Sequence, residues 1–274
     1  MKRILVPTDF SKIAYEALKF AHEISKAYEA EIVVLHVVEL PRNLLWNYPF
    51  QDDIIKEMKK QANINYLQWV KKVGSQNTNM EFHAVQNSVV PAINKFIKEE
   101  HIDLVVMGTQ GTSGFSEFFI GSNTEKIVRF SKVPVFSIKK SVKISSIKNI
   151  IFPTELTLHE SGLVNKVKEL QADLKAHLHI VYVNTPTNFK IGNEIDALMD
   201  DYINHYGFDN FSTHVVSDMF EQAGINAYAK DVSGALIAMG THSRKGLSHF
   251  FMGSIAEDLV NHGEWPIWTY SIEK

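Results

Sequence analysis

The chain contains the stretch MGTQGTSGFSEFFIGS at residues 107–122 and repeats it, in altered form, as MGTHSRKGLSHFFMGS at residues 239–254. The glycines that frame the two stretches keep a constant spacing, and so do Pro134 and Pro266 further along. Upstream, Val-Pro-Thr-Asp at 6–9 matches Phe-Pro-Thr-Glu at 152–155 with a wider spacing. A match in consistent register indicates that one structural unit is present twice, with a shortened middle in the second copy.

The pattern of apolar residues around these stretches alternates between strands and helices. EIVVLHVV at 31–38 is a nearly continuous aliphatic run, which is typical of a parallel strand buried on both faces. SKIAYEALKFAHEISKA at 11–27 repeats its apolar residues at helical spacing, with Ser11 or Asp9 as the expected N-cap. Alternating strands and helices predict an α/β fold with parallel sheets and right-handed crossovers. Strands are expected at 3–6, 31–38, 80–85, 104–107 and 135–138 of the first copy, and at 149–152, 178–183, 212–216, 235–239 and 267–270 of the second.

The polar, basic bridge at 139–146 separates the copies, so we predict domains at residues 1–140 and 146–274. The net charge of -3 and the pI near 6.5 offer no basic surplus for a phosphate backbone, which predicts no nucleic-acid partner. The absence of cysteine excludes disulfides and thiolate metal sites. No apolar run is long enough to span a bilayer or to form a leader, so we expect a cytoplasmic protein without a membrane partner.

The first and fourth strands of the first copy end in the two most unusual loops. Ligands of open α/β sheets bind beyond the carboxyl ends of strands, where the strand order reverses. Gly108 and Gly111 lack a Cβ, so they can adopt positive φ and let backbone N–H groups approach a phosphate. Gly121 then leads into a helix whose first N–H groups favour an anion. The hydroxyls of Ser122 and Thr124 are expected to add contacts to phosphate or to a magnesium shell.

Three elements of the chain resemble the universal stress protein family: Val-Pro-Thr-Asp-Phe-Ser at 6–11, Leu-His-Val at 35–37, and the Gly-x2-Gly-x9-Gly-Ser spacing of 108–122. The resemblance covers both copies. It implies two tandem domains, each a five-stranded parallel sheet with helices on both faces. It also implies an adenine nucleotide as ligand (ATP, ADP or AMP, with or without Mg²⁺), and pairing of the two domains through the strands at 135–138 and 267–270. A further homodimer is compatible with that arrangement.

Transferred to this sequence, the family's site lies in domain 1. The resemblance implies that residues at the end of the first strand hold adenine and ribose, that one residue of the second strand packs on the base, and that the glycine loop holds ribose and phosphates. In that order these residues are Pro7, Thr8 and Asp9; Val37; and Met107, Gly108, Gly111, Gly121, Ser122, Asn123 and Thr124.

The two copies depart from the family's pattern in opposite ways. Copy 1 has Thr112 where family loops often carry a basic residue. Copy 2 has Arg244 and Lys245, but Ser243 replaces the second glycine and Glu155 replaces Asp9. We therefore expect domain 2 to bind a nucleotide weakly or not at all.

Three functions follow as hypotheses. The first is a stress-response sensor or regulator that binds an adenine nucleotide in domain 1. The alternatives are a nucleotide-independent interaction scaffold and a slow ATPase, because no nucleophile–base pair, Walker loop or Gly-x-Ser-x-Gly elbow indicates dedicated catalysis. His177 and His179 share one face of a predicted strand, but no metal-ligand spacing accompanies them, and we predict no metal site. Glycine that serves only to pack a helix on the sheet is the structural alternative for the loop of copy 1.

Overall fold

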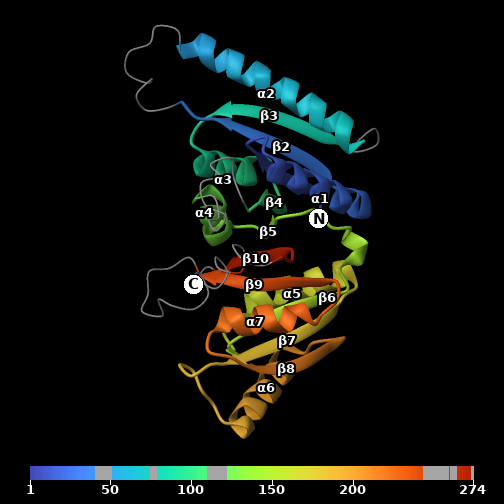
Figure 1. Ribbon diagram of the computed structural model, residues 1–274, viewed down its shortest axis with the longest axis vertical. Helices are drawn as coiled ribbons and strands as arrows, with labels where there is room; N and C mark the ends of the chain where they lie inside the picture. Colours follow the sequence, from blue (N-terminus) through green and yellow to red (C-terminus); the bar gives the residue numbers. More distant parts are fainter. Residues whose placement is uncertain (41–50, 75–78, 110–121, 243–258, 260–263, 273–274) are drawn as a thin grey trace. The chain divides into compact units, whose positions relative to one another are not determined.

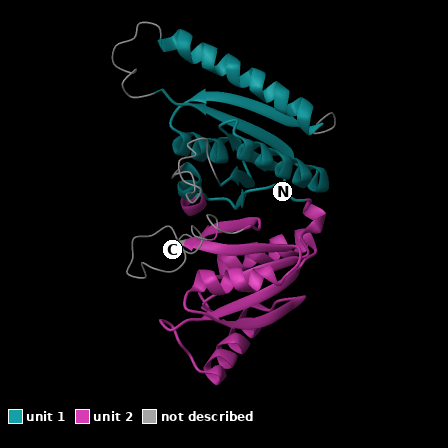
Figure 2. Cartoon of the chain, in the orientation of Figure 1, with its two compact units in different colours: residues 1–127, 131–142 teal, residues 128–130, 143–274 magenta. Residues whose placement is uncertain are grey.

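The computed structural model describes residues 1–40, 51–74, 79–109, 122–242, 259 and 264–272 (Figure 1). The chain separates into two compact units, residues 1–127 with 131–142 and residues 128–130 with 143–274 (Figure 2). The predicted limits of the folding domains, 1–140 and 146–274, stay a prediction. Gly111 and Gly121 lie outside the described residues.

Unit 1 is built on five parallel strands in the order β3-β2-β1-β4-β5. The chain moves outward from β1 to β3 and then returns to β4 and β5, so the order reverses between β1 and β4. Right-handed crossovers place α1 and α2 on one face and α3 and α4 on the other. The elements are β1 (Arg3–Thr8), α1 (Lys12–Tyr28), β2 (Glu31–Val38), α2 (Gln51–Val73), β3 (Met80–Gln86), α3 (Val89–Glu99), β4 (Leu104–Gly108), α4 (Ser122–Phe130) and β5 (Val135–Ile138).

Unit 2 repeats this plan, with five parallel strands in the order β10-β9-β6-β7-β8 and the reversal between β6 and β9. The predicted parallel α/β class is confirmed. A 3-10 turn, η2 (Ile144–Ser146), precedes the first strand. The other elements are β6 (Asn149–Pro153), α5 (Ser161–Leu174), β7 (His177–Asn184), α6 (Gly192–Tyr206), β8 (Phe211–Ser217), α7 (Glu221–Lys230), β9 (Ala235–His242) and β10 (Ile267–Ile272).

The central strands carry the core because both of their faces are covered. Ile32, Val33, Val34 and Leu35 of β2 are all fully buried, as the continuous aliphatic run predicts. In unit 1, α1 and α2 pack together through Tyr15 and Trp69, whose ring centroids lie 5.1 Å apart. These buried layers hold the carboxyl ends of the strands at one edge of each sheet.

The amino end of the unit 1 sheet is held by one guanidinium group. Arg3 on β1 contacts three carboxylates, with N–O distances of 3.0 Å to Glu31, 3.0 Å to Glu81 and 2.7 Å to Glu100. These acids come from β2, from β3 and from the end of α3, so one side chain links the amino ends of three strands to a helix. Its pKa is raised by a hydrogen bond to Glu100 and by attraction to the three acids, which outweigh the opposing effect of burial.

Candidate functional site

The order of strands in unit 1 reverses between β1 and β4. β1 and β4 pair only at Ile4–Leu104 and Leu5–Val105. The two strands then continue to Thr8 and Gly108 without further pairing to each other. The crevice between such strand ends is the usual ligand position in an open α/β sheet.

The loop after β1 is shaped by its own polar side chains. Thr8 Oγ1 accepts a hydrogen bond from the backbone N–H of Phe10 at 2.9 Å, and Asp9 Oδ1 accepts one from the N–H of Ser11 at 2.9 Å. Phe10 is thereby held at a φ of 62°, a left-handed conformation that is uncommon for a bulky residue. Ser11, one of the two expected N-caps, accepts from the N–H of Ala14 and begins α1. The loop leaves Asp9 exposed at the carboxyl end of the sheet.

The second strand contributes two neighbouring residues to this end. His36 Nδ1 lies 2.8 Å from the carbonyl oxygen of Thr8, and this contact joins β2 to the end of β1. Val37, the expected contact for the base, is half-buried and lies one residue before the end of β2. Pro7 lies within β1 in register with Leu35.

The end of β4 and the start of α4 are joined by a hydrogen bond. The buried hydroxyl of Thr124 donates to the carbonyl oxygen of Gly108 at 3.1 Å. This bond uses the single proton of the hydroxyl, and the expected contact of Thr124 with a phosphate or a magnesium shell stays a prediction. Met107 is buried beside Gly108, and Asn123 is half-buried in the first turn of α4. Ser122 is the first residue of α4, and its side chain lies outside the described part of the chain.

Gly108 lies where a side chain would meet α1. It is still paired with Ile138 of β5, and it is absent from the described residues with positive φ. A Cβ at this position would lie 2.4 Å from Cγ2 of Ile13 and 3.0 Å from that residue's backbone carbon and oxygen. At Gly108, glycine allows α1 to pack closely on the sheet, as the structural alternative proposed.

Unit 2 has the same strand-end loop in a modified form. Thr154 Oγ1 accepts from the N–H of Leu156 at 3.0 Å, and Leu156 has a φ of 61°, almost the value of Phe10. Glu155 occupies the place of Asp9 and is exposed. β6 and β9 pair with each other from Asn149 to Ile151 and then continue without further pairing between the two strands. The early end of pairing at the reversal of strand order is therefore present in both units.

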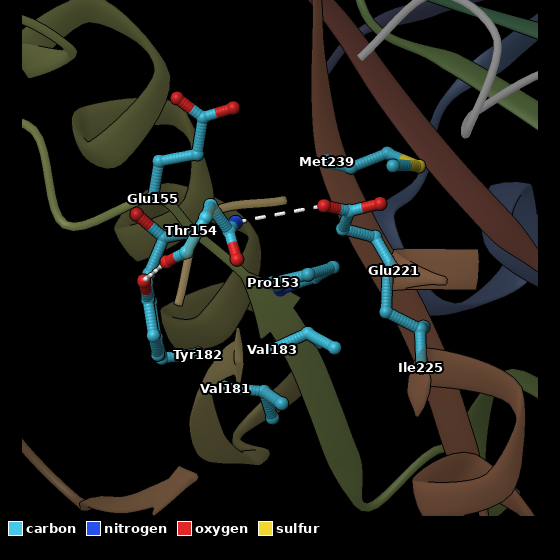
Figure 3. Close-up of a pocket in the computed structure, with 10 residues that line it drawn as sticks. Pro153, Thr154, Glu155, Val181, Tyr182, Val183, Glu221, Ile225 and Met239 are labelled. Carbon is cyan, nitrogen blue, oxygen red and sulfur yellow. Dashed lines mark hydrogen bonds between the residues drawn. The ribbon is translucent and has the colours of Figure 1, made fainter. Parts of the chain in front are cut away.

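A pocket lies at these strand ends in unit 2, with a cavity volume of about 40 Å³ (Figure 3). That volume is enough for a few water molecules or a small chemical group. Thr154, Glu155 and Tyr182 line one side, and Glu221, Ile225 and Met239 line the other. The remaining lining residues are Pro153, Val181, Val183 and Asn188.

A hydrogen-bonded loop after β7 borders the pocket. Oε1 of Glu221, the first residue of α7, accepts from the amide of Asn188 at 3.5 Å and lies 3.1 Å from the hydroxyl of Thr185, which is also 2.8 Å from Oδ1 of Asn188. Tyr182 donates its hydroxyl to the carbonyl of Asn188 at 3.3 Å. Glu221 and Asn188 were not identified from the sequence. A comparison of the first residues of α3 and α7 would have identified Glu221, because the equivalent residue of the first copy is Val89.

A buried acid, Glu160, lies at the end of the loop between β6 and α5. Glu160 is 6% exposed, and its Oε2 has no hydrogen-bond partner among the described residues. Burial raises the pKa of Glu160 to about 7, and repulsion from Glu155 adds to the effect, against a hydrogen bond with Thr157. Burial likewise raises the pKa of Tyr202, which is fully buried on α6. Glu160 therefore titrates close to neutral pH.

The histidines singled out in the sequence belong to a hydrogen-bonded network on β7 and β8. Nε2 of His179 lies 3.0 Å from Oδ1 of Asn149, and its Nδ1 lies 2.8 Å from the hydroxyl of Tyr228 and 3.3 Å from Nε2 of His214. Burial, together with repulsion by His177 and His214, lowers the pKa of His179 to about 4. The described residues contain no group of three or more His, Cys, Asp or Glu side chains that could hold a metal ion. The absence of a metal site stays a prediction.

Comparisons with known proteins agree with this architecture. The sequence profile described as the universal stress protein family matches residues 1–139 and 208–271. A universal stress protein of Methanocaldococcus jannaschii is 32% identical over 150 residues, which cover 52% of this chain and 84% of that protein. Another from Bacillus subtilis is 27% identical over 152 residues, covering 50% and 98% respectively. Each of these relatives thus matches about half of the chain.

One solved structure shows the fold over nearly the whole length. A crystal structure of a universal stress protein from Archaeoglobus fulgidus has a TM-score of 0.75 and 22% sequence identity, and the match covers 98% of each chain. In the part of the chain that the structure describes, no helix is both long and apolar enough to cross a bilayer. The family profile spans most of the sequence and matches both copies, so the chain belongs to the universal stress protein family.

Proposed function

We propose that unit 1 binds an adenine nucleotide at the crevice between β1 and β4, and that the protein acts as a stress-response sensor or regulator. The observation that carries this proposal is that the described residues before the two predicted loops end neighbouring strands at one edge of the sheet. Asp9 follows β1, and Gly108 ends the neighbouring β4, where pairing between the strands has stopped. Thr124 attaches the start of α4 to the same point, so that the amino end of this helix lies close to the strand ends.

The chemistry of this edge supports a nucleotide. The exposed carboxylate of Asp9 can accept hydrogen bonds from ribose or adenine, and the half-buried Val37 offers an apolar contact for a base. The first N–H groups of α4 have no intrahelical acceptors and favour an anion. The hydroxyl oxygen of Thr124 keeps its lone pairs, so it can contact a cation such as Mg²⁺ but not donate to a phosphate. The cytoplasmic location, the pairing of the two domains and a further homodimer stay predictions.

Thermal unfolding of the ligand-free protein with ATP, ATP and magnesium, or AMP tests the proposal. A ligand at a concentration 100 times its Kd should stabilise the protein by about 2.7 kcal/mol. Asp9→Ala should lower the affinity for the nucleotide by about tenfold or more, because the ribose or base loses its hydrogen-bond acceptor. Glu155→Ala, the matched change in unit 2, should leave the stabilisation intact. If no nucleotide changes the unfolding temperature, the scaffold hypothesis is favoured instead.

A further inference from the structure

The pocket of unit 2 differs in charge from the corresponding place in unit 1. α3 begins with Val89 and α7 begins with Glu221, so a carboxylate replaces an apolar side chain at the same point of the fold. Glu221 lines the pocket, and Glu155 adds a second carboxylate to the lining. Lys, Arg and His are absent from the described lining residues. Two negative charges in a lining that has no described cationic residue of its own repel a phosphate and attract a positive group.

Only one oxygen of the Glu221 carboxylate makes polar contacts with other described residues. Oε1 makes both polar contacts of this carboxylate, with the Thr185 hydroxyl and the Asn188 amide, and these contacts hold the loop after β7 against α7. Within the described residues, no hydrogen bond or ion pair reaches Oε2. The nearby ammonium group of Lys190 lies 3.3 Å from the hydroxyl of Tyr182 and above the ring of that tyrosine, rather than at Glu221. Figure 3 shows Glu221 next to Met239 in the pocket, with one of its oxygens bonded within the lining.

The rest of the site is apolar. Val183, Ile225 and Met239 form its walls together with Pro153 and Val181. The two loops that border the pocket also expose large apolar side chains, which is unusual for loops that only connect elements. Next to Asn188 and Glu221 in the sequence are Phe189, which is 68% exposed, Met219, which is 65% exposed, and Phe220, which is 59% exposed.

We propose that the pocket of unit 2 binds a small organic cation, an ammonium or amidinium group attached to an apolar body. The positive group pairs with Oε2 of Glu221, and the apolar body contacts the walls and the exposed side chains of the bordering loops. The site is independent of nucleotide binding in unit 1. The duplicated fold thus carries two sites of opposite charge preference, an anion-accepting site in unit 1 and a cation-accepting site in unit 2.

Two methionines allow the sites to be observed separately. Met107 on β4 and Met239 on β9 each precede a glycine and occupy the same position in the two copies. The chain contains eight methionines, few enough for their methyl groups to be resolved by NMR after labelling with methyl-¹³C-methionine. Met239 lines the pocket and should report occupancy of unit 2. Met107 should report occupancy of unit 1.

The test titrates the full, untagged chain with benzylammonium, with neutral benzyl alcohol as the isosteric control. We expect benzylammonium to shift the Met239 methyl resonance to saturation and to leave Met107 unchanged, whereas benzyl alcohol binds about tenfold more weakly or less. Glu221→Gln keeps an acceptor for Thr185 and Asn188 but removes the charge. The affinity for benzylammonium should therefore fall to that for benzyl alcohol. Glu169→Gln removes an exposed charge that pairs with Lys166 on α5 and should change nothing.

Three results would overturn the proposal: a Met239 resonance that benzylammonium does not move, equal affinity for the amine and the alcohol, or unchanged affinity in Glu221→Gln. Equivalent chemical shifts of the other methionines in the wild type and the variant show that the variant is folded. A nucleotide that fails to bind unit 1 would leave these results unaffected, because Met107 reports that failure separately.

Discussion

Replacing Glu160 with glutamine should raise the free energy of unfolding by about 2–3 kcal/mol above about pH 8, and by far less near pH 5. The carboxyl group is buried without a partner for Oε2, and its pKa is raised from 4.5 to about 7. In the unfolded chain the group is ionised above pH 4.5, whereas in the folded protein it keeps its proton until about pH 7. The folded state therefore binds more protons in this interval, and its stability falls as the pH rises through it. The neutral amide of glutamine avoids this cost.

Urea denaturation at several pH values measures the effect. The curve for the wild type should decline between about pH 5 and pH 7 relative to that for Glu160→Gln, and the two should stay apart above that range. Glu169→Gln, an exposed acid on α5, serves as the control and should follow the wild type. Parallel curves for the wild type and Glu160→Gln would show that the folded protein does not keep the carboxyl protonated.

Gly108→Ala should destabilise the protein by about 1–3 kcal/mol, which is the usual cost of overpacking a tightly packed contact. The new Cβ would lie 2.4 Å from Cγ2 of Ile13, whose side chain can turn away, but also 3.0 Å from backbone atoms of Ile13, which cannot move without shifting α1. Because α1 begins immediately after the Asp9 loop, a shift of this helix should also weaken nucleotide binding.

Gly162→Ala is the matched control for Gly108→Ala. Nothing lies within 4 Å of a Cβ at Gly162, in the first turn of α5, and alanine there should be neutral or stabilise the protein by up to about 1 kcal/mol. Adding Ile13→Ala to Gly108→Ala removes the closest contact but leaves the backbone contacts, so it should not restore full stability. Equal stability of Gly108→Ala and Gly162→Ala in urea would contradict close packing of α1 at Gly108.

The sequence predicts the central strands well because strands that are buried on both faces consist of consecutive aliphatic residues. The run at 31–38 has the limits of β2, whereas β1 and β7 extend one or two residues further than predicted. Thr8 and Asn184 end these strands as polar residues, yet their backbones still pair with the neighbouring strands. Local apolar pattern cannot show that pairing, because it is decided by the partner strand.

The contacts of the site are harder to predict from the sequence than the fold, because they join distant parts of the chain. The role of Gly108 depends on Ile13, a residue of the first helix, and a glycine pattern alone could not separate positive φ from close packing. The proton of Thr124 is taken by Gly108 only because α4 returns to the end of β4. Glu221 enters a pocket because the loop after β7 folds back onto it through Thr185 and Asn188. Each of these facts needs the tertiary arrangement.

Titration of the methyl-¹³C-methionine-labelled protein with ATP tests most directly whether unit 1 is a nucleotide site. The account predicts that the Met107 methyl resonance shifts and saturates, that Met239 stays in place, and that Asp9→Ala abolishes or greatly weakens the response. A Met107 resonance that ATP leaves unmoved, or a response confined to Met239, would contradict it.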